Sequence, residues 1–342
     1  MKPAPKTLLD VSNLKIYYEL DQGRRVYALN GVSFKIEPGE RIGLVGESGS
    51  GKSTLAKTIL HLLPANSRVT DGTVLFQGRD LVKLDENAMN TIRWQKISLV
   101  TQSAMNALNP VARISDQFIE TFMAHGISGK RHILQEAQHL FEMVGLNKKR
   151  LFDYPHQFSG GMRQRVIIAM AIALSPDLII ADEPTTALDV IMQAQIIDLL
   201  EDLSVEKNIS LILITHDISI VAETCQKVGV MYAGCLMEFG PIGQVFNTPY
   251  HPYTMGLKGA FPSIKELEKS LISIPGSPPQ LTRPPAGCGF APRCPFVIDV
   301  CRHTIPPKVE AEPEHWTACH RFKEAAQFRD RAKEIFLARD NQ

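Results

Sequence analysis

A glycine-rich segment near the start of the chain has the residue types needed to hold phosphate groups. It reads Gly46-Glu47-Ser48-Gly49-Ser50-Gly51-Lys52-Ser53, between an apolar run at 42–45 and a helix-like run at 54–60. Glycines let successive backbone N–H groups turn toward phosphate oxygens, and the following helix directs its positive end at them. Lys52 would reach the β and γ phosphates, and the Ser53 hydroxyl would bind Mg²⁺. The segment therefore predicts a P-loop and not a turn that only joins a strand to a helix.

Two adjacent carboxylates follow a second apolar run, at 178–181. Asp182 and Glu183 stand at the predicted carboxyl end of this strand, where ligands bind in open α/β sheets. Asp182 suits the Mg²⁺ shell, and Glu183 suits the polarisation of the water that attacks the γ phosphate. A pair of surface acids at a strand end is the alternative, but the P-loop upstream favours a catalytic pair.

Two more polar residues follow runs that are rich in apolar residues. His216 comes after the run 210–214, where an imidazole could hydrogen-bond a γ-phosphate oxygen. Gln102 comes after the run 97–101, and its amide could contact Mg²⁺ or the attacking water. A lone histidine is more often structural, and a glutamine alone is weak evidence. Their place in the chain relative to the two motifs makes them candidates.

The elements that must position these residues alternate between strand and helix patterns. Strands are expected at 8–11, 32–36, 42–45, 178–181 and 210–214, and helices at 114–125, 133–144, 166–174 and 190–203. Residues 103–175 form an expected helical insertion. After about residue 240 prolines become frequent, with nine between 241 and 285, which predicts an extended, loop-rich appendix. The fold class is therefore α/β with a β-rich start.

Composition limits the function classes. Lysine plus arginine number 37 and aspartate plus glutamate 36, so overall charge gives no support for binding nucleic acid. No apolar run reaches the roughly 18 residues that would span a bilayer. The first residues lack a secretory signal, so we expect a cytosolic protein in which disulfides are rare.

A third motif offers a second place for phosphate. Ser159-Gly160-Gly161-Met162-Arg163-Gln164 precedes an apolar helix and supplies a hydroxyl and a helix start. With the P-loop, Gln102, the Asp182-Glu183 pair, Ala187-Leu188-Asp189 and His216, it resembles the pattern of the ATP-binding subunits of ABC transporters over about residues 6–245.

The resemblance implies a fold, a domain division and a site. It implies a RecA-like P-loop NTPase core with an antiparallel β subdomain over 1–102 and 176–240, a helical subdomain over 103–175 and an extension over 241–342. It implies catalytic roles for Lys52, Gln102, Glu183 and His216, and Mg²⁺ binding by Ser53, Gln102 and Asp182. The implied ATP contacts are Tyr18, with Tyr17 as the competing choice for adenine, then Gly46, Glu47, Ser48, Gly49, Ser50, Gly51, Lys52, Ser53, Thr54, Gln102, Ser159, Gly160, Gly161, Asp182 and His216. Ser159 and Gly161 would act in trans, across a head-to-tail dimer.

The extension carries four cysteines, Cys288, Cys294, Cys301 and Cys319. So many thiols in a short stretch of a cytosolic protein suggest a metal. Structural zinc sites usually show C-x2-C pairs, which are absent here, whereas an iron–sulfur cluster tolerates wider spacing. Zinc and unligated thiols remain alternatives. The segments 246–254 and 274–279 resemble the C-terminal extension of peptide-importer ATPases, some of which carry a [4Fe–4S] cluster on such cysteines.

The resemblance implies an ATPase that powers import of di- or oligopeptides. Expected partners are a second ATPase subunit, which the pattern favours as a related paralogue, two membrane permeases and an external solute-binding protein. The expected location is the cytoplasmic face of the cell membrane, held peripherally through the permeases, with segment 103–110 meeting a permease. Nickel, glutathione or an oligosaccharide is the alternative cargo. A soluble ABC ATPase acting on nucleic acid or ribosomes, and a metabolic P-loop kinase, are more remote alternatives.

Overall fold

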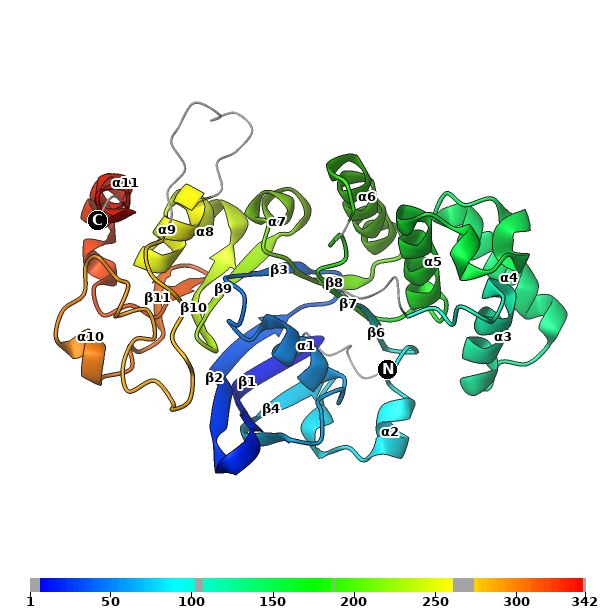
Figure 1. Cartoon of the computed structure of the whole chain (residues 1–342), viewed down its shortest axis with the longest axis horizontal. Coiled ribbons are helices and arrows are strands. Elements are labelled where there is room, and N and C mark those ends of the chain that lie inside the picture. Colours follow the sequence, from blue (N-terminus) through cyan, green and yellow to red (C-terminus); the bar gives the residue numbers. More distant parts are fainter. Residues whose placement is uncertain (1–6, 102–106, 187, 261–273, 341–342) are drawn as a thin grey trace. The chain divides into compact units, whose positions relative to one another are not determined.

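The computed structural model describes residues 7–101, 107–186, 188–260 and 274–340. The chain divides into two compact units. The first unit is Met1–Glu37, Arg41–Lys83 and Thr215–Gln342, and the second is Pro38–Glu40 and Leu84–Ile214. Figure 1 labels the elements along the chain. The three-part domain division expected from the sequence stays a prediction.

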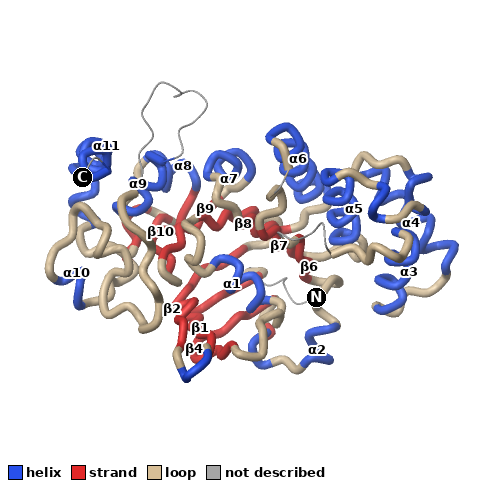
Figure 2. Tube along the Cα trace, viewed as in Figure 1, coloured by secondary structure: helices blue, strands red, loops and turns tan. Residues whose placement is uncertain are grey.

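The first unit contains two sets of strands. An antiparallel sheet has the order β2-β1-β4-β5, in which β1 pairs with both β2 and β4 (Figure 2). A second set runs β11-β12-β10-β9-β3, with β3 parallel to β9 and the other pairs antiparallel. The strands are β1 (Leu9–Glu19), β2 (Arg25–Ile36), β3 (Arg41–Val45), β4 (Ser67–Phe76), β5 (Arg79–Asp80), β9 (Lys227–Tyr232), β10 (Cys235–Pro241), β11 (Val309–Glu312) and β12 (His315–Thr317).

The helices of the first unit include one that follows the P-loop and several in the extension. They are α1 (Lys52–Ile59), α7 (Ile218–Thr224), α8 (Ile242–Asn247), α9 (Pro252–Ala260), α10 (Val300–His303) and α11 (Ala325–Asp340). Helix α9 packs beside α11, in yellow and red in Figure 1. The extension is therefore more regular than its prolines predicted. Two of its strands, β11 and β12, join the same series of strands as β3, which leads into the P-loop.

The second unit is built on three parallel strands in the order β8-β7-β6. These are β6 (Ile97–Val100), β7 (Leu178–Asp182) and β8 (Ser210–Ile214), and every residue of β7 and β8 is buried. Continuous apolar runs are typical of strands covered on both faces. The helices are α2 (Glu86–Asn90), α3 (Ile114–Ala124), α4 (Lys130–Met143), α5 (Gly160–Ile172) and α6 (Val190–Glu206). Every expected strand and helix overlaps an observed one. The largest differences are that β1 extends to Glu19, that β2 begins at Arg25, and that α5 begins at Gly160, six residues before the apolar run at 166.

Short 3₁₀ helices complete both units. They cover Asp21–Gly23, Leu81–Lys83 and Phe322–Glu324 in the first unit, and Lys148–Phe152 and Pro155–Gln157 in the second. No helix within the described residues is both long and apolar enough to cross a membrane.

Candidate nucleotide-binding and catalytic site

The P-loop connects β3 to α1 in the first unit and takes a backbone path that favours glycine. Gly46, Gly49 and Gly51 have φ of 144°, 78° and 103°. A Cβ on Gly46 would lie 2.1 Å from the carbonyl oxygen of Met231, and one on Gly51 would lie 2.6 Å from that of Ala28. Positive φ and close backbone approach both exclude ordinary side chains. The loop can therefore bring its backbone against a ligand.

Lys52 begins α1 and is buried, with 7% of its surface exposed. Its Nζ donates to the carbonyl oxygens of Gly46 at 2.6 Å and Glu47 at 3.0 Å, and to Ser50 Oγ at 3.2 Å. The loop thus folds around the ammonium group. A phosphate bound at the start of α1 would meet this charge and the helix N-terminus together.

Tyr18 lies beside the P-loop helix, and Tyr17 points elsewhere. The Tyr18 hydroxyl is 3.1 Å from Thr54 Oγ1 on α1. The Tyr17 ring packs against Tyr27, with ring centroids 5.8 Å apart, and Arg25 stacks on it at 4.4 Å. Adjacent residues of a strand face opposite sides. Tyr18 therefore lies beside the helix that follows the P-loop, whereas Tyr17 packs against Tyr27 and Arg25. This geometry favours Tyr18 over Tyr17 as the adenine contact.

His216 follows β8 and opens the last part of the first unit. It is exposed. The preceding backbone is tied to the P-loop strand, since the N–H of Thr215 donates to the carbonyl of Leu44 at 3.4 Å. Asp217 caps α7 by accepting from the N–H of Ser219 at 2.8 Å. The structure thus brings the backbone beside His216 to β3, two residues before the P-loop begins.

Asp182 and Glu183 lie at the carboxyl end of β7 in the second unit. Asp182 is the last strand residue and is 7% exposed. Glu183 has φ of 48°, which is uncommon outside glycine, and its N–H donates to the carbonyl of Ile214 at 2.8 Å. Its Oε2 accepts from the Thr186 hydroxyl at 3.0 Å. A strained backbone held by neighbouring bonds is a feature of functional sites.

Ser159 caps the N-terminus of α5 in the second unit. It is exposed, and its Oγ accepts from the N–H of Met162 at 3.4 Å. Gly161 is buried, and a Cβ there would lie 2.0 Å from Met192 Cε of α6. The Met192 side chain of α6 therefore packs directly over Gly161 of α5, a contact that the sequence did not reveal. The exposed helix start remains available to an anion.

Two of the expected motifs lie wholly or partly outside the described part of the chain. Gln102 lies outside it, as do residues 103–106 of the segment expected to meet a permease. Ala187, the first residue of Ala187-Leu188-Asp189, also lies outside, whereas Asp189 caps α6 by accepting from the N–H of Met192 at 2.9 Å.

Four cysteines of the extension line one small pocket. Cys288, Cys294, Cys301 and Cys319 surround a cavity of about 20 Å³, which we call the cysteine pocket. Burial raises the pKa of Cys288 to about 11 and the pKa values of Cys294 and Cys319 to about 12 each. These thiols are therefore protonated at neutral pH unless a metal displaces the proton. None of them forms a disulfide.

A buried histidine borders the cysteine pocket. His251 is 1% exposed, and burial lowers its pKa to about 3, so the ring is neutral. Its Nδ1 accepts from the N–H of Tyr253 at 3.0 Å, which assigns the ring proton to Nε2, 3.9 Å from Cys288 Sγ. Within the described residues, no group of three or more His, Cys, Asp or Glu side chains is arranged to hold a metal ion.

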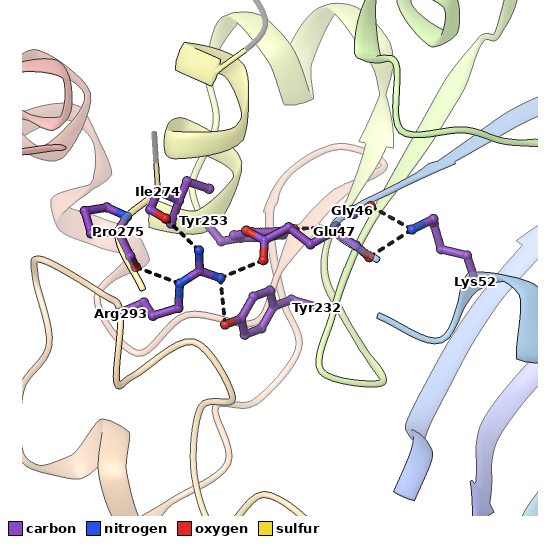
Figure 3. A network of polar contacts seen from close by, with 8 residues as sticks. All are labelled: Gly46, Glu47, Lys52, Tyr232, Tyr253, Ile274, Pro275 and Arg293. Carbon is purple, nitrogen blue, oxygen red and sulfur yellow. Dashed lines mark hydrogen bonds and ion pairs between the residues drawn. The ribbon is translucent and has the colours of Figure 1, made fainter. Parts of the chain in front are cut away.

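The sequence did not reveal that the extension binds the P-loop. Arg293 donates to Glu47 Oε2 at 2.7 Å, and the N–H of Glu47 donates to the Tyr253 hydroxyl at 2.9 Å (Figure 3). Arg293 follows Glu47 by 246 positions, and no spacing rule relates residues so far apart. The available signal was a single arginine between Pro292 and Cys294 in an apolar context.

Comparison with known proteins agrees with this site. A family model described as ABC transporter matches residues 29–186, and one described as oligopeptide/dipeptide transporter, C-terminal region, matches residues 237–301. The solved dimeric structure of MJ0796, a bacterial ABC transporter cassette, is 29% identical with a TM-score of 0.61, over 68% of this chain and 98% of that chain. The α/β P-loop NTPase fold expected from the sequence is confirmed.

Curated relatives match most of the chain. The oligopeptide transport ATP-binding protein OppD of Escherichia coli strain K12 is 45% identical over 314 residues, or 91% of this chain and 92% of the relative. OppD of Haemophilus influenzae is 46% identical over 304 residues, or 88% of this chain and 93% of the relative. The chain belongs to the ATP-hydrolysing subunits of ABC transporters. Its similarity reaches into the extension, where the peptide-transporter region matches.

Proposed function

We propose that the chain hydrolyses ATP to drive uptake of di- and oligopeptides through separate permease subunits. The match of residues 237–301 to the C-terminal region of oligopeptide/dipeptide transporters carries this proposal. That region lies entirely beyond the ATP-binding family match at 29–186, so it adds information on the kind of transporter. Two relatives are named as oligopeptide transport ATP-binding proteins, which also supports peptides as the cargo.

The first unit supplies the groups proposed to hold ATP. Lys52 binds the β and γ phosphates, since its buried ammonium group is held inside the P-loop by hydrogen bonds to loop oxygen atoms. Tyr18 contacts adenine, and Thr54 lies beside it on α1. Ser53 contributes its hydroxyl to Mg²⁺, which takes oxygen ligands. His216 hydrogen-bonds the γ phosphate from an exposed position whose preceding backbone is tied to β3.

The second unit supplies the carboxylates proposed for hydrolysis. Asp182 completes the Mg²⁺ shell, with Gln102 as the further contact to Mg²⁺ and the attacking water. Glu183 polarises that water and takes its proton, a role for which the Thr186 hydroxyl orients the carboxylate. Ser53, Gln102 and Asp182 would hold Mg²⁺, which would supply positive charge to stabilise the charge that develops on the phosphates.

The signature segment is proposed to act across a dimer. Ser159 and the start of α5 would cover the γ phosphate of ATP held by a second ATPase subunit, as an exposed helix N-terminus can. A solved relative, MJ0796, is described as dimeric. We propose a related paralogue as the second subunit, two permeases that the segment 103–110 contacts, and an external solute-binding protein. The assembly would place this chain at the cytoplasmic face of the cell membrane.

The cysteine pocket is proposed to hold a [4Fe–4S] cluster. Four thiols around one cavity match the ligand number of such a cluster, whose cysteines bind separate irons. Structural zinc sites usually have C-x2-C pairs, and the spacing of these four cysteines contains none. Cys288, Cys294, Cys301 and Cys319 would be the ligands. His251 would donate a hydrogen bond toward the Cys288 sulfur. The cluster would order the extension.

Iron content tests the cluster. Protein purified without oxygen should contain about four irons per chain and absorb visible light. Cys294→Ser should lose most of this iron because it removes one of four ligands, and a lower melting temperature should accompany the loss. Cys225→Ser, a buried cysteine outside the pocket, is the matched control and should keep its iron. One zinc per chain, or equal iron in both variants, would contradict the assignment.

A solute panel tests the proposed cargo. Cells that lack this chain should lose uptake of labelled di- and tripeptides, and the intact gene should restore it. Uptake of nickel, glutathione and an oligosaccharide should be unchanged in the same cells. Normal peptide uptake together with lost uptake of one of the other solutes would replace peptides by that solute.

A further inference from the structure

Arg293 lies in the extension, yet its guanidinium binds the P-loop. It is 8% exposed and donates through one Nη to Glu47 Oε2 at 2.7 Å and to the Tyr232 hydroxyl at 3.1 Å. It also donates to the carbonyl oxygens of Pro275 at 2.9 Å and Ile274 at 2.7 Å (Figure 3). Four acceptors fix the planar group in one orientation. The Glu47 side chain is therefore held by a group whose position the extension sets.

The Glu47 backbone is held from both sides. Its N–H donates to the hydroxyl of Tyr253, a residue with no exposed surface. Burial raises the pKa of the Tyr253 hydroxyl far above its ordinary value, so this group stays neutral. The Glu47 carbonyl accepts from Lys52 Nζ at 3.0 Å. Glu47 thus connects two residues of the extension directly to the phosphate-binding lysine.

The turn that carries Arg293 is packed against the same region. Phe290 contacts the rings of Tyr232 and Tyr253, with ring centroids 5.4 Å and 5.2 Å apart. The N–H of Cys294 donates to the carbonyl of Phe290 at 2.9 Å. The turn therefore holds Arg293 in place against the loop through aromatic packing and its own backbone bonds.

We propose that Arg293 is a positioning residue of the ATP site that acts through Glu47. By fixing Glu47, it holds the P-loop backbone in the path that lets Lys52 and the neighbouring N–H groups meet phosphate. The inference rests on ATP binding at the P-loop and goes beyond the proposed function, since it gives the extension a part in nucleotide affinity.

A double-mutant cycle tests the proposal on the full chain. Arg293→Gln and Glu47→Gln should each raise the Kd for MgATP by about fivefold to thirtyfold, since each removes a charged hydrogen bond from the loop. The Kd of the double variant should not exceed that of the more affected single variant, because the two substitutions break the same interaction between Arg293 and Glu47. Arg283→Gln, an exposed arginine of the same extension, is the control and should bind ATP normally.

Two results would overturn the proposal. One is wild-type affinity in Arg293→Gln, and the other is a double variant whose loss equals the product of the single losses, which would mean that Arg293 acts independently of Glu47. If Arg293→Gln does not fold, Tyr253→Phe provides the second test, since it removes only the hydroxyl that holds the Glu47 N–H. It should weaken ATP binding twofold or more at an unchanged melting temperature, and unchanged affinity would count against the proposal. Absence of ATP binding by the wild-type chain would instead contradict the ATP site itself.

Discussion

Glu183→Gln should bind MgATP normally and hydrolyse it about 10²- to 10⁴-fold more slowly, because the amide cannot take the proton of the attacking water. The substitution keeps the size of the side chain and its bond from Thr186, so the turn after β7 should persist. ATP that is bound and not hydrolysed should hold two subunits together. Single-turnover hydrolysis and size-exclusion chromatography with MgATP measure the two effects.

The matched control for this result is Glu206→Gln, an exposed glutamate at the end of α6. It changes the same charge in the same unit and should leave hydrolysis unchanged. Turnover of Glu183→Gln within threefold of the wild type would show that another group accepts the proton. The strained φ of 48° at Glu183 would then need a different explanation.

Lys52→Ala should lower the affinity for MgATP by about 10- to 100-fold, and ATP hydrolysis should be lost as well. The side chain is the buried charge at the centre of the loop, and a charged hydrogen bond contributes about 1.5–3 kcal/mol. The three acceptors that it now serves, two carbonyls and the Ser50 hydroxyl, would lose their donor. Calorimetric titration with MgATP measures the affinity.

Lys57→Ala supplies the control for this loss. Lys57 lies on the same helix, is exposed and occupies its last turn. Its removal takes away one positive charge without touching the loop, so ATP affinity should stay within twofold of the wild type. Equal losses in Lys52→Ala and Lys57→Ala would indicate general weakening of α1 instead of a lost phosphate contact.

The nucleotide site was predictable because its signals are local. A strand, a glycine turn and a helix follow one another within about 20 residues, and glycine spacing reports the backbone path at Gly46 and Gly51 directly. Buried parallel strands such as β7 and β8 also stand out, since both of their faces are apolar.

The start of α5 and the two strands of the extension, β11 and β12, were harder to predict from the sequence. The first turn of α5 carries glycines and arginine, so apolar periodicity began only at Val166, although Ser159 caps the helix earlier. Strands β11 and β12 have four and three residues, too few for a period-2 pattern to stand out. Prolines elsewhere in the extension concealed them.

Contacts between distant segments could not be predicted at all. The bond from Arg293 to Glu47 depends on how the extension folds back within the first unit. The gathering of four cysteines around one pocket has the same origin, since their spacing alone left a cluster, zinc and unligated thiols open. Such contacts are properties of the tertiary fold and have no local sequence pattern.

We propose that ATP hydrolysis by this chain drives peptide import. The most direct measurement follows labelled tripeptide entry and phosphate release together in vesicles that contain the assembled transporter, with ATP on the side of this chain. We expect peptide to accumulate with ATP, and both accumulation and phosphate release to fall together when Glu183→Gln replaces the wild-type subunit. Peptide entry that continues undiminished with Glu183→Gln, or phosphate release without any peptide entry in the wild type, would contradict the claim.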